Sequence, residues 1–443
     1  MSAVDVPPSG RPSPEPGAAN GSPPGSGPSD LGRIALLVGT VAALVAVATW
    51  AGQGDLVLVI ACLIVMIMVH ELGHLLAAKR GRMQVTEYFL GFGPRLWSVR
   101  RGETEYGIKA VPLGGYVKIP GMTNLDVVDP ADEHRTYRAQ PFGARLAVAL
   151  AGSTMHFLMA FVLLWGLLVF IGHPDTSRTS IERTAALGGR PGPAQVAGLR
   201  PGDVVVSADG VPVGADAGPL VAAIRSHPGT PVILVVLRDG VRRTVAVTPV
   251  DGRTVARSGT GSPAGGRPYG LIGVGLGAPV VRTGPLAAVP RTVTDLARFS
   301  WAAVAGVAHL FSPSAALARF SQVTDARAAS QAAADGTRVQ SVVGAVQTAQ
   351  QAAHAGVADL LLVLISINLF VGIFNLFPML PLDGGHVAIA CYERVRSIGR
   401  RERYQADVAK LLPLTWAMVG FLGILFATSF LTDVLHPMAN PFG

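Results

Sequence analysis

The chain contains five long segments with almost no formal charge, and these segments limit what it can fold into. A helix needs roughly 20 apolar residues to cross a bilayer, and each segment comes close to that length. Half of the residues are hydrophobic, only 14% are charged and the mean hydropathy is +0.44, which is typical of a membrane protein. We therefore predict a polytopic α-helical membrane protein with about five transmembrane helices, at residues 34–51, 56–78, 146–171, 358–383 and 411–431.

Arginine and lysine gather in two connections: between the second and third spans, and between the fourth and fifth. Because short basic loops stay in the cytosol, the N-terminus is predicted inside and the C-terminus outside. The net charge of +8 is thus a topology signal. No basic patch is interleaved with aromatic residues, so no nucleic-acid partner is expected.

The regions outside the spans differ in character. Residues 1–33 are rich in Pro, Gly and Ser, which predicts a disordered cytosolic tail. Residues 83–137 are rich in strand-forming residues and form a cytosolic β region around a turn at Gly102. Residues 172–357 form the one large outside region. Cys62 and Cys391 are too few and too far apart to form a disulfide framework.

The second span ends in the sequence HELGH, which places ionisable side chains where they are most costly. On a helix, His70 and His74 share one face and Glu71 lies beside them, as in zinc proteases. The alternative is that the two histidines only end a span near the interface. Intramembrane ionisable residues are by default functional, so a metal site is the favoured interpretation, and it requires a third ligand.

A third ligand is offered by the segment NLFPMLPLDGGH, residues 375–386. Asp383 ends the fourth predicted span, at the same depth as the two histidines. Pro378 and Pro381 each remove a helix N–H, and two glycines follow Asp383, so the backbone here is expected to be unwound. Unwound backbone at membrane depth must line a cavity or be buried in protein.

Together, the two motifs resemble the signatures of the site-2 protease family of intramembrane zinc metalloproteases. The resemblance extends over residues 56–431. Residues 91–121 look like the family's membrane-associated β-hairpin region, and GLRPGDVVVSADGVPV, residues 198–213, looks like part of a PDZ domain. Bacterial members with one PDZ domain, especially actinobacterial ones, are the most similar group. The resemblance implies a PDZ-like extracytoplasmic α+β domain at residues 181–279. An interfacial, amphipathic linker is expected at residues 286–357, where the apolar stretch at residues 300–311 is too short to span.

The resemblance also implies a mechanism. His70, His74 and Asp383 would hold Zn²⁺ with its fourth position open, as catalytic zinc requires. Glu71 would take a proton from the nucleophilic water and return it to the leaving amine. Asn375 is the family's candidate for a hydrogen bond to the substrate carbonyl.

Two departures from the family pattern are visible. Residues 34–51 add a span before the usual first one. At the start of the third span, where the family has Gly-Pro-x-x-Asn, this chain has GSTMH, residues 152–156. His156 therefore replaces the family's Asn, either as an ordinary polar contact or close enough to affect the metal site.

The function implied is intramembrane cleavage of single-span membrane proteins, such as anti-sigma factors, after an upstream protease has trimmed them. The enzyme would sit as a multi-pass protein in the bacterial cell membrane, with the active-site face and the N-terminus cytosolic. The PDZ domain and the C-terminus would be extracytoplasmic. Two alternatives remain at this point: an inactive scaffold whose PDZ domain binds partners, and an unrelated HExxH membrane peptidase such as a prenyl-protein processing enzyme.

Overall fold

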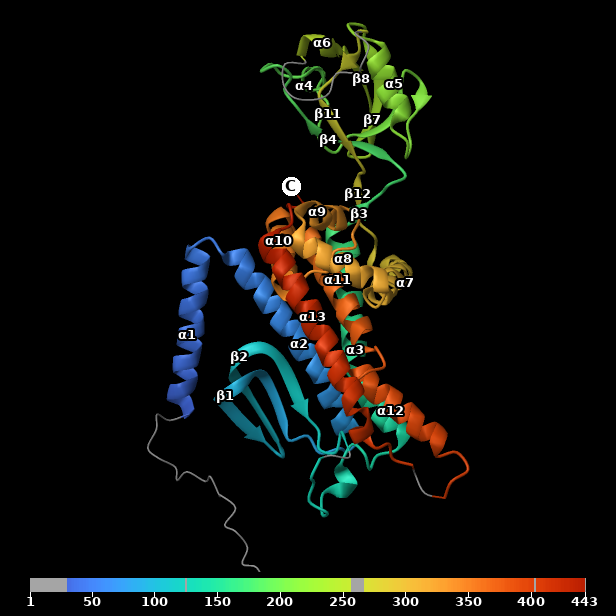
Figure 1. Ribbon diagram of the computed structural model, residues 1–443. Helices are drawn as coiled ribbons and strands as arrows, with labels where there is room; N and C mark the ends of the chain where they lie inside the picture. The colour runs from blue at the N-terminus through green and yellow to red at the C-terminus, as the bar shows by residue number, and fades with distance from the viewer. Residues whose placement is uncertain (1–29, 124–125, 256–266, 402–403, 443) are drawn as a thin grey trace, which may run out of the picture.

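The computed structural model describes residues 30–123, 126–255, 267–401 and 404–442, and it consists of a helical bundle and a separate β-rich domain (Figure 1). In these residues, four helices are long and apolar enough to cross a membrane. They are α2 (Gly54–Arg80), α3 (Phe142–Gly166, continued by the π-helical turn η2, Leu167–Ile171), α11 (Val357–Asn375) and α13 (Leu412–Leu435). The prediction of a polytopic helical membrane protein is confirmed.

A fifth span is less simple than the sequence suggested. Helix α1 (Asp30–Trp50) covers nearly all of the extra span expected at residues 34–51, but it is not among these four helices, so that span stays a prediction. Helices α7 (Pro285–Leu310) and α8 (Pro313–Thr324) would count as a span only if taken together, and they are bent by 79°. Of the tail expected at residues 1–33, residues 1–29 lie outside the described residues, and the remaining residues belong to α1, which begins at Asp30.

Helix α3 is the centre of the bundle, since it contacts α2, α7, α11 and α12 (Asp383–Arg396). Its apolar face buries Ala160 and Leu164 against Ile365 and Leu369 of α11. Without a hydrophobic effect between helices in lipid, such contacts rely on close packing of small and branched side chains. The helix that carries HELGH and the helix that begins with Asp383 therefore both contact α3.

Strands β1 (Glu87–Arg101) and β2 (Thr104–Lys118) turn at Gly102, whose φ of +64° suits glycine. Residues 87–90 pair with residues 105–108 on one side and with residues 115–118 on the other. The two long strands thus curl into a small sheet in which residues 115–118 pair on one side only within the described chain. This sheet lies beside α2 (Figure 1).

The β-rich domain stands apart from the bundle (Figure 1). Its main sheet has the order β11-β4-β5-β7-β8, with β6 paired to β5. The bounds are β4 Thr179–Thr184, β5 Val204–Ala208, β6 Val211–Pro212, β7 Val232–Arg238, β8 Val241–Val247 and β11 Val274–Gly277, and helix α5 is Gly218–Ser226. Leu220 and Ile224 of α5 pack on the sheet in one buried cluster, which gives the domain a core of its own.

One ion pair ties the loop before β5 to the end of β7. Arg238 donates to both carboxylate oxygens of Asp203, each at 2.7 Å. Burial alone would raise the pKa of Asp203, but hydrogen bonds from Arg238 and from the Arg200 backbone amide outweigh burial and hold the pKa below its usual value. The carboxylate is therefore ionised and the pair intact at neutral pH.

Two short strands connect the domain to the bundle. Strand β3 (His173–Pro174), just after α3, pairs with β12 (Val280–Val281), just before α7. The bundle end of this ribbon is fixed by hydrogen bonds from the Thr283 amide to the Leu168 carbonyl, and from the Trp165 indole to the Pro285 carbonyl. Both chains therefore leave the bundle at one place.

The connection after α11 corrects one prediction. Helix α11 ends at Asn375, and Asp383 is the first residue of the next helix, α12 (Asp383–Arg396), rather than the end of the fourth span. The seven residues between them are not helical, because Pro378 and Pro381 cannot continue a helix. A Cβ on Gly384 would lie 2.3 Å from backbone atoms of Leu376, so glycine lets α12 fold back closely onto this loop.

Candidate metal centre

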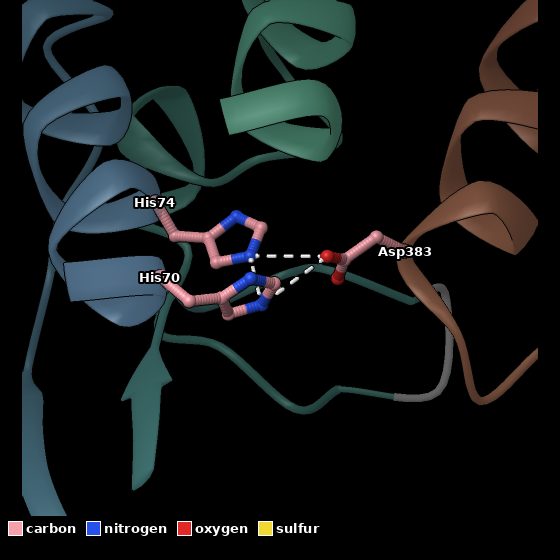
Figure 2. A group of neighbouring side chains, drawn as sticks. All are labelled: His70, His74 and Asp383. Atoms are coloured by element: carbon pink, nitrogen blue, oxygen red, sulfur yellow. Dashed lines mark hydrogen bonds and ion pairs between the residues drawn. The ribbon is translucent and has the colours of Figure 1, made fainter. Parts of the chain in front are cut away.

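Three side chains from two distant segments meet in one largely buried group (Figure 2). His70 and His74 extend from α2, and Asp383 faces them from the start of α12. The Nε2 atoms of the two histidines are 3.3 Å apart, and Asp383 Oδ2 lies 3.3 Å from His74 Nε2 and 3.4 Å from His70 Nε2. The exposed fractions of His70 and His74 are 9% and 7%.

The tautomer of His74 is fixed from behind. Its Nδ1 lies 2.8 Å from the Val148 carbonyl oxygen in α3, and because a carbonyl only accepts, Nδ1 carries the proton. The Nε2 atom of the neutral ring then presents a lone pair to the centre of the group. Such a hydrogen bond behind the ring is the usual support of a metal-binding histidine.

The three atoms fit a zinc ion. They form a nearly equilateral triangle, and its edges are too long for strong N–H···O hydrogen bonds. With Zn–N and Zn–O bonds of about 2.0–2.1 Å, two ligands of a tetrahedron lie about 3.3–3.4 Å apart, which matches the triangle. Lone pairs and a carboxylate oxygen facing one another repel unless a cation lies among them. These residues can therefore hold zinc with the fourth position open.

Gly152 of α3 makes room for both imidazoles. A Cβ built on this residue would lie 2.3 Å from His70 Cε1 and 2.4 Å from His74 Nε2. These distances are below any real Cβ contact, so the rings pack directly against the α3 backbone. The close approach of α2 and α3 at this point requires glycine.

The end of β2 lies against Glu71. A Cβ on Gly115 would approach Glu71 Cγ at 3.1 Å, and the Val117 backbone lies close to the Glu71 carboxylate. Nearby, the Tyr88 hydroxyl donates to the Met68 carbonyl at 2.8 Å. Burial, followed by the charge of Glu71, raises the pKa of Tyr88 to about 12, so this hydroxyl keeps its proton. The curled sheet thus helps to orient the side chain beside the metal ligands.

The other residues singled out from the sequence lie as follows. Asn375 is the half-buried last residue of α11. His156 is buried, its Nδ1 lies 2.9 Å from Asn368 Oδ1, and its ring centroid is 4.9 Å from that of His70. It therefore contacts a site histidine, although the metal-binding group found among the described residues contains only His70, His74 and Asp383. Cys62 and Cys391 are free thiols outside that group.

Sequence reasoning missed the supporting residues. Val148 acts through its backbone, so its side chain gives no signal. Gly152 and Gly115 are two of 53 glycines, and nothing in the local pattern distinguishes a glycine that faces an imidazole. Gly152 does open the GSTMH segment in which the family motif was expected, and this is the one signal that could have identified it.

The chain is similar in sequence to known proteins. The model of the family described as Peptidase family M50 matches residues 58–418. The zinc metalloprotease Rip1 of Mycobacterium tuberculosis is 34% identical over 411 residues, covering 87% of this chain and 97% of the relative. Rip1 of Mycolicibacterium smegmatis is 31% identical, covering 87% and 98%. A putative zinc metalloprotease of Nostoc is 30% identical, covering 85% and 96%.

Proposed function

Because the chain belongs to peptidase family M50, the site-2 protease family, and is a zinc metalloprotease, we propose that it cleaves single-span membrane proteins within or near their transmembrane segment. The observation that carries the proposal is the triangle of His70, His74 and Asp383, in which the two histidines lie on a helix long and apolar enough to span a membrane. Membership of this family sets aside the unrelated HExxH peptidase. An inactive scaffold would not need three ligand atoms placed at metal-binding distances from one another.

We assign the residues as follows. His70, His74 and Asp383 bind the zinc ion, and Glu71 is the general acid and base. Zinc, when bound, supplies the Lewis acidity that makes water a nucleophile at neutral pH. Glu71 accepts the proton of the attacking water and passes it to the leaving amine. Asn375 hydrogen-bonds the oxygen of the scissile carbonyl as negative charge develops on it.

The substrate must present an extended backbone at the site, because a helix hides its amides in internal hydrogen bonds. Residues 115–118 offer a strand edge next to Glu71. An unwound substrate segment could pair with this edge by strand addition, so that its backbone is held beside the general base. The edge would thereby select for segments that unwind easily.

We propose that the active-site end of the bundle is cytosolic and that the β-rich domain is extracytoplasmic, as the distribution of basic residues favours. In a variant lacking Cys62 and Cys391, Arg101→Cys and Ile398→Cys should be protected from an impermeant thiol reagent added to intact cells. Arg242→Cys, in the β-rich domain, should be labelled. Labelling in the opposite pattern would invert the orientation.

The β-rich domain is proposed to be a PDZ-like filter. It is inserted between α3 and α7 and stands away from the metal site (Figure 1). From that position it cannot reach the scissile bond, but it can obstruct substrates that still carry a bulky outer domain. The partners are then single-span proteins, such as anti-sigma factors, and an upstream protease that trims them.

The function and the filter are tested together by reconstituting the enzyme with a single-span protein in full-length and trimmed forms. The intact enzyme should cut only the trimmed form, and the masses of the products should place the cut within or near the span. A variant in which a flexible bridge replaces residues 181–279 keeps every metal-site residue and should cut both forms.

Three other outcomes are informative. No cleavage of the trimmed form by the intact enzyme would contradict the proposed substrate class. Unchanged selectivity in the deletion variant would contradict the filter. Loss of cleavage of both forms by a folded deletion variant would show that the domain recruits substrate instead.

A further inference from the structure

Helix α3 supplies no metal ligand, yet it supports the ligands of α2. The Val148 carbonyl holds His74, and Gly152 receives both imidazoles. The third ligand, Asp383, lies on α12, which is separated from α11 by a seven-residue non-helical loop. The start of α12 packs closely on this loop, and α12 also contacts α3, the helix against which the two histidines lie.

A buried ion pair joins α12 to α3. Arg145, one turn from the start of α3, donates to Glu393 Oε2 on α12 at 2.5 Å, and their side chains are only 5% and 6% exposed. The other oxygen, Glu393 Oε1, accepts the Ala406 backbone amide at 2.7 Å. The Tyr137 hydroxyl donates to the Arg145 carbonyl, and the Arg145 guanidinium lies over the Tyr137 ring. One carboxylate therefore joins α3, α12 and the chain leading to α13.

The positions of these residues relate the pair to the metal site. On α3, Arg145 precedes Gly152 by seven residues, about 10 Å along the helix. On α12, Glu393 follows Asp383 by ten residues, about 15 Å. Ala390 and Glu393 are buried on the α12 face that meets α3. The two helices are thus fixed to each other at a second point, away from the ligands.

Stability alone is a weak reason for such a pair. Burying two charges costs so much solvation that apolar residues of similar volume are often as stabilising or better, although removing one partner is destabilising. What the pair provides and apolar residues do not is one defined geometry, because charge-assisted hydrogen bonds from the planar guanidinium fix the direction as well as the distance between the partners.

We propose that Arg145 and Glu393 are positioning residues that hold α12 against α3, so that Asp383 meets His70 and His74 at ligand distance. The inference rests on the proposed function, since it assumes that these three residues bind zinc. Neither Arg145 nor Glu393 contacts the metal ligands in the described structure, so neither is a catalytic residue.

The chain contains a matched control pair at the other end of the bundle (Figure 1). Arg338 donates to Asp433 Oδ1 at 2.9 Å, and the other oxygen, Oδ2, accepts the Ser341 backbone amide at 2.7 Å. These two side chains are 3% and 2% exposed. In both pairs, the carboxylate accepts hydrogen bonds from one arginine and one backbone amide. The second pair, however, joins the C-terminal end of α13 to the segment before α10 (Val342–Ala355).

The experiment compares Glu393→Gln with Asp433→Asn in the full-length protein in detergent. Each change puts an amide NH₂ where a buried carboxylate oxygen accepted a hydrogen bond, so both should lower the melting temperature. Zinc affinity is measured by competition with a chelator, and the visible spectrum of the cobalt-substituted protein reports ligand geometry. Glu393→Gln should weaken zinc binding by about tenfold, the lower end of the range for changes in groups that orient metal ligands, and should alter the cobalt spectrum. Asp433→Asn should leave both unchanged.

Equal effects of the two variants on zinc affinity would overturn the proposal, as would an unchanged affinity in Glu393→Gln. If Glu393→Gln does not fold, the double variant Arg145→Leu, Glu393→Leu replaces it, since an apolar pair can preserve stability. A folded double variant with wild-type zinc affinity would also overturn the proposal. If the wild-type protein itself binds no zinc, the proposed function fails, and that result is distinct from failure of the positioning role.

Discussion

Replacing Glu71 with glutamine is expected to leave zinc bound and to reduce cleavage by about a hundredfold to ten-thousandfold, the usual contribution of a general acid–base group. Glutamine keeps the volume of the side chain and one carbonyl oxygen, but it cannot accept and return a proton. The measurement is cleavage of the trimmed single-span substrate, beside the zinc content of the purified protein. Cleavage by Glu71→Gln at near the wild-type rate would disprove the assigned role.

The zinc ligands provide the contrasting control. His70→Ala and Asp383→Ala each remove one corner of the triangle, so both should lose zinc as well as activity. A protein that kept full zinc content after either change would show that the metal lies elsewhere. The two classes of variant together separate proton transfer from metal binding.

Gly152→Ala is expected to abolish zinc binding, with an affinity at least about a hundredfold weaker, although the change adds only one methyl group. The new Cβ would overlap both imidazoles, at 2.3 Å from His70 Cε1 and 2.4 Å from His74 Nε2. Overpacking of this kind costs about 1–3 kcal/mol, so the protein should still fold while the rings are displaced. Zinc affinity and melting temperature, measured on the same sample, distinguish the two effects.

Gly143→Ala is the matched control on the same helix. A Cβ at Gly143 meets nothing within 4 Å, and alanine is the better helix former. Zinc affinity should therefore stay at the wild-type value. If Gly152→Ala bound zinc as tightly as Gly143→Ala, the close packing of the imidazoles against α3 would not be needed for the site.

The parts of the site that lie close together in the sequence could be predicted well. His70, Glu71 and His74 are related by the helical repeat alone, and the prolines before Asp383 indicate that the helix must stop. Long apolar segments likewise predict α2, α3, α11 and α13, because the bilayer imposes both length and composition.

The supporting residues could not be predicted in this way. Arg145 and Glu393 are 248 residues apart, and no local pattern indicates that an arginine at the start of one span meets a glutamate on another helix. Gly152 depends equally on how closely α2 and α3 approach. Helix α7 lies almost wholly within the linker predicted at residues 286–357, and its length could not be predicted because Pro290 and charged residues interrupt its apolar pattern.

The paired strands β3 and β12 have a mechanical consequence. Both run from the bundle to the β-rich domain, so a force that pulls the domain away stretches two covalent chains in parallel and does not load the hydrogen bonds between them. Resistance to extension is therefore high. Resistance to bending is low, because a two-stranded ribbon with two residue pairs has little stiffness of its own. The domain is thus held at a set distance from the bundle while its direction is only weakly constrained.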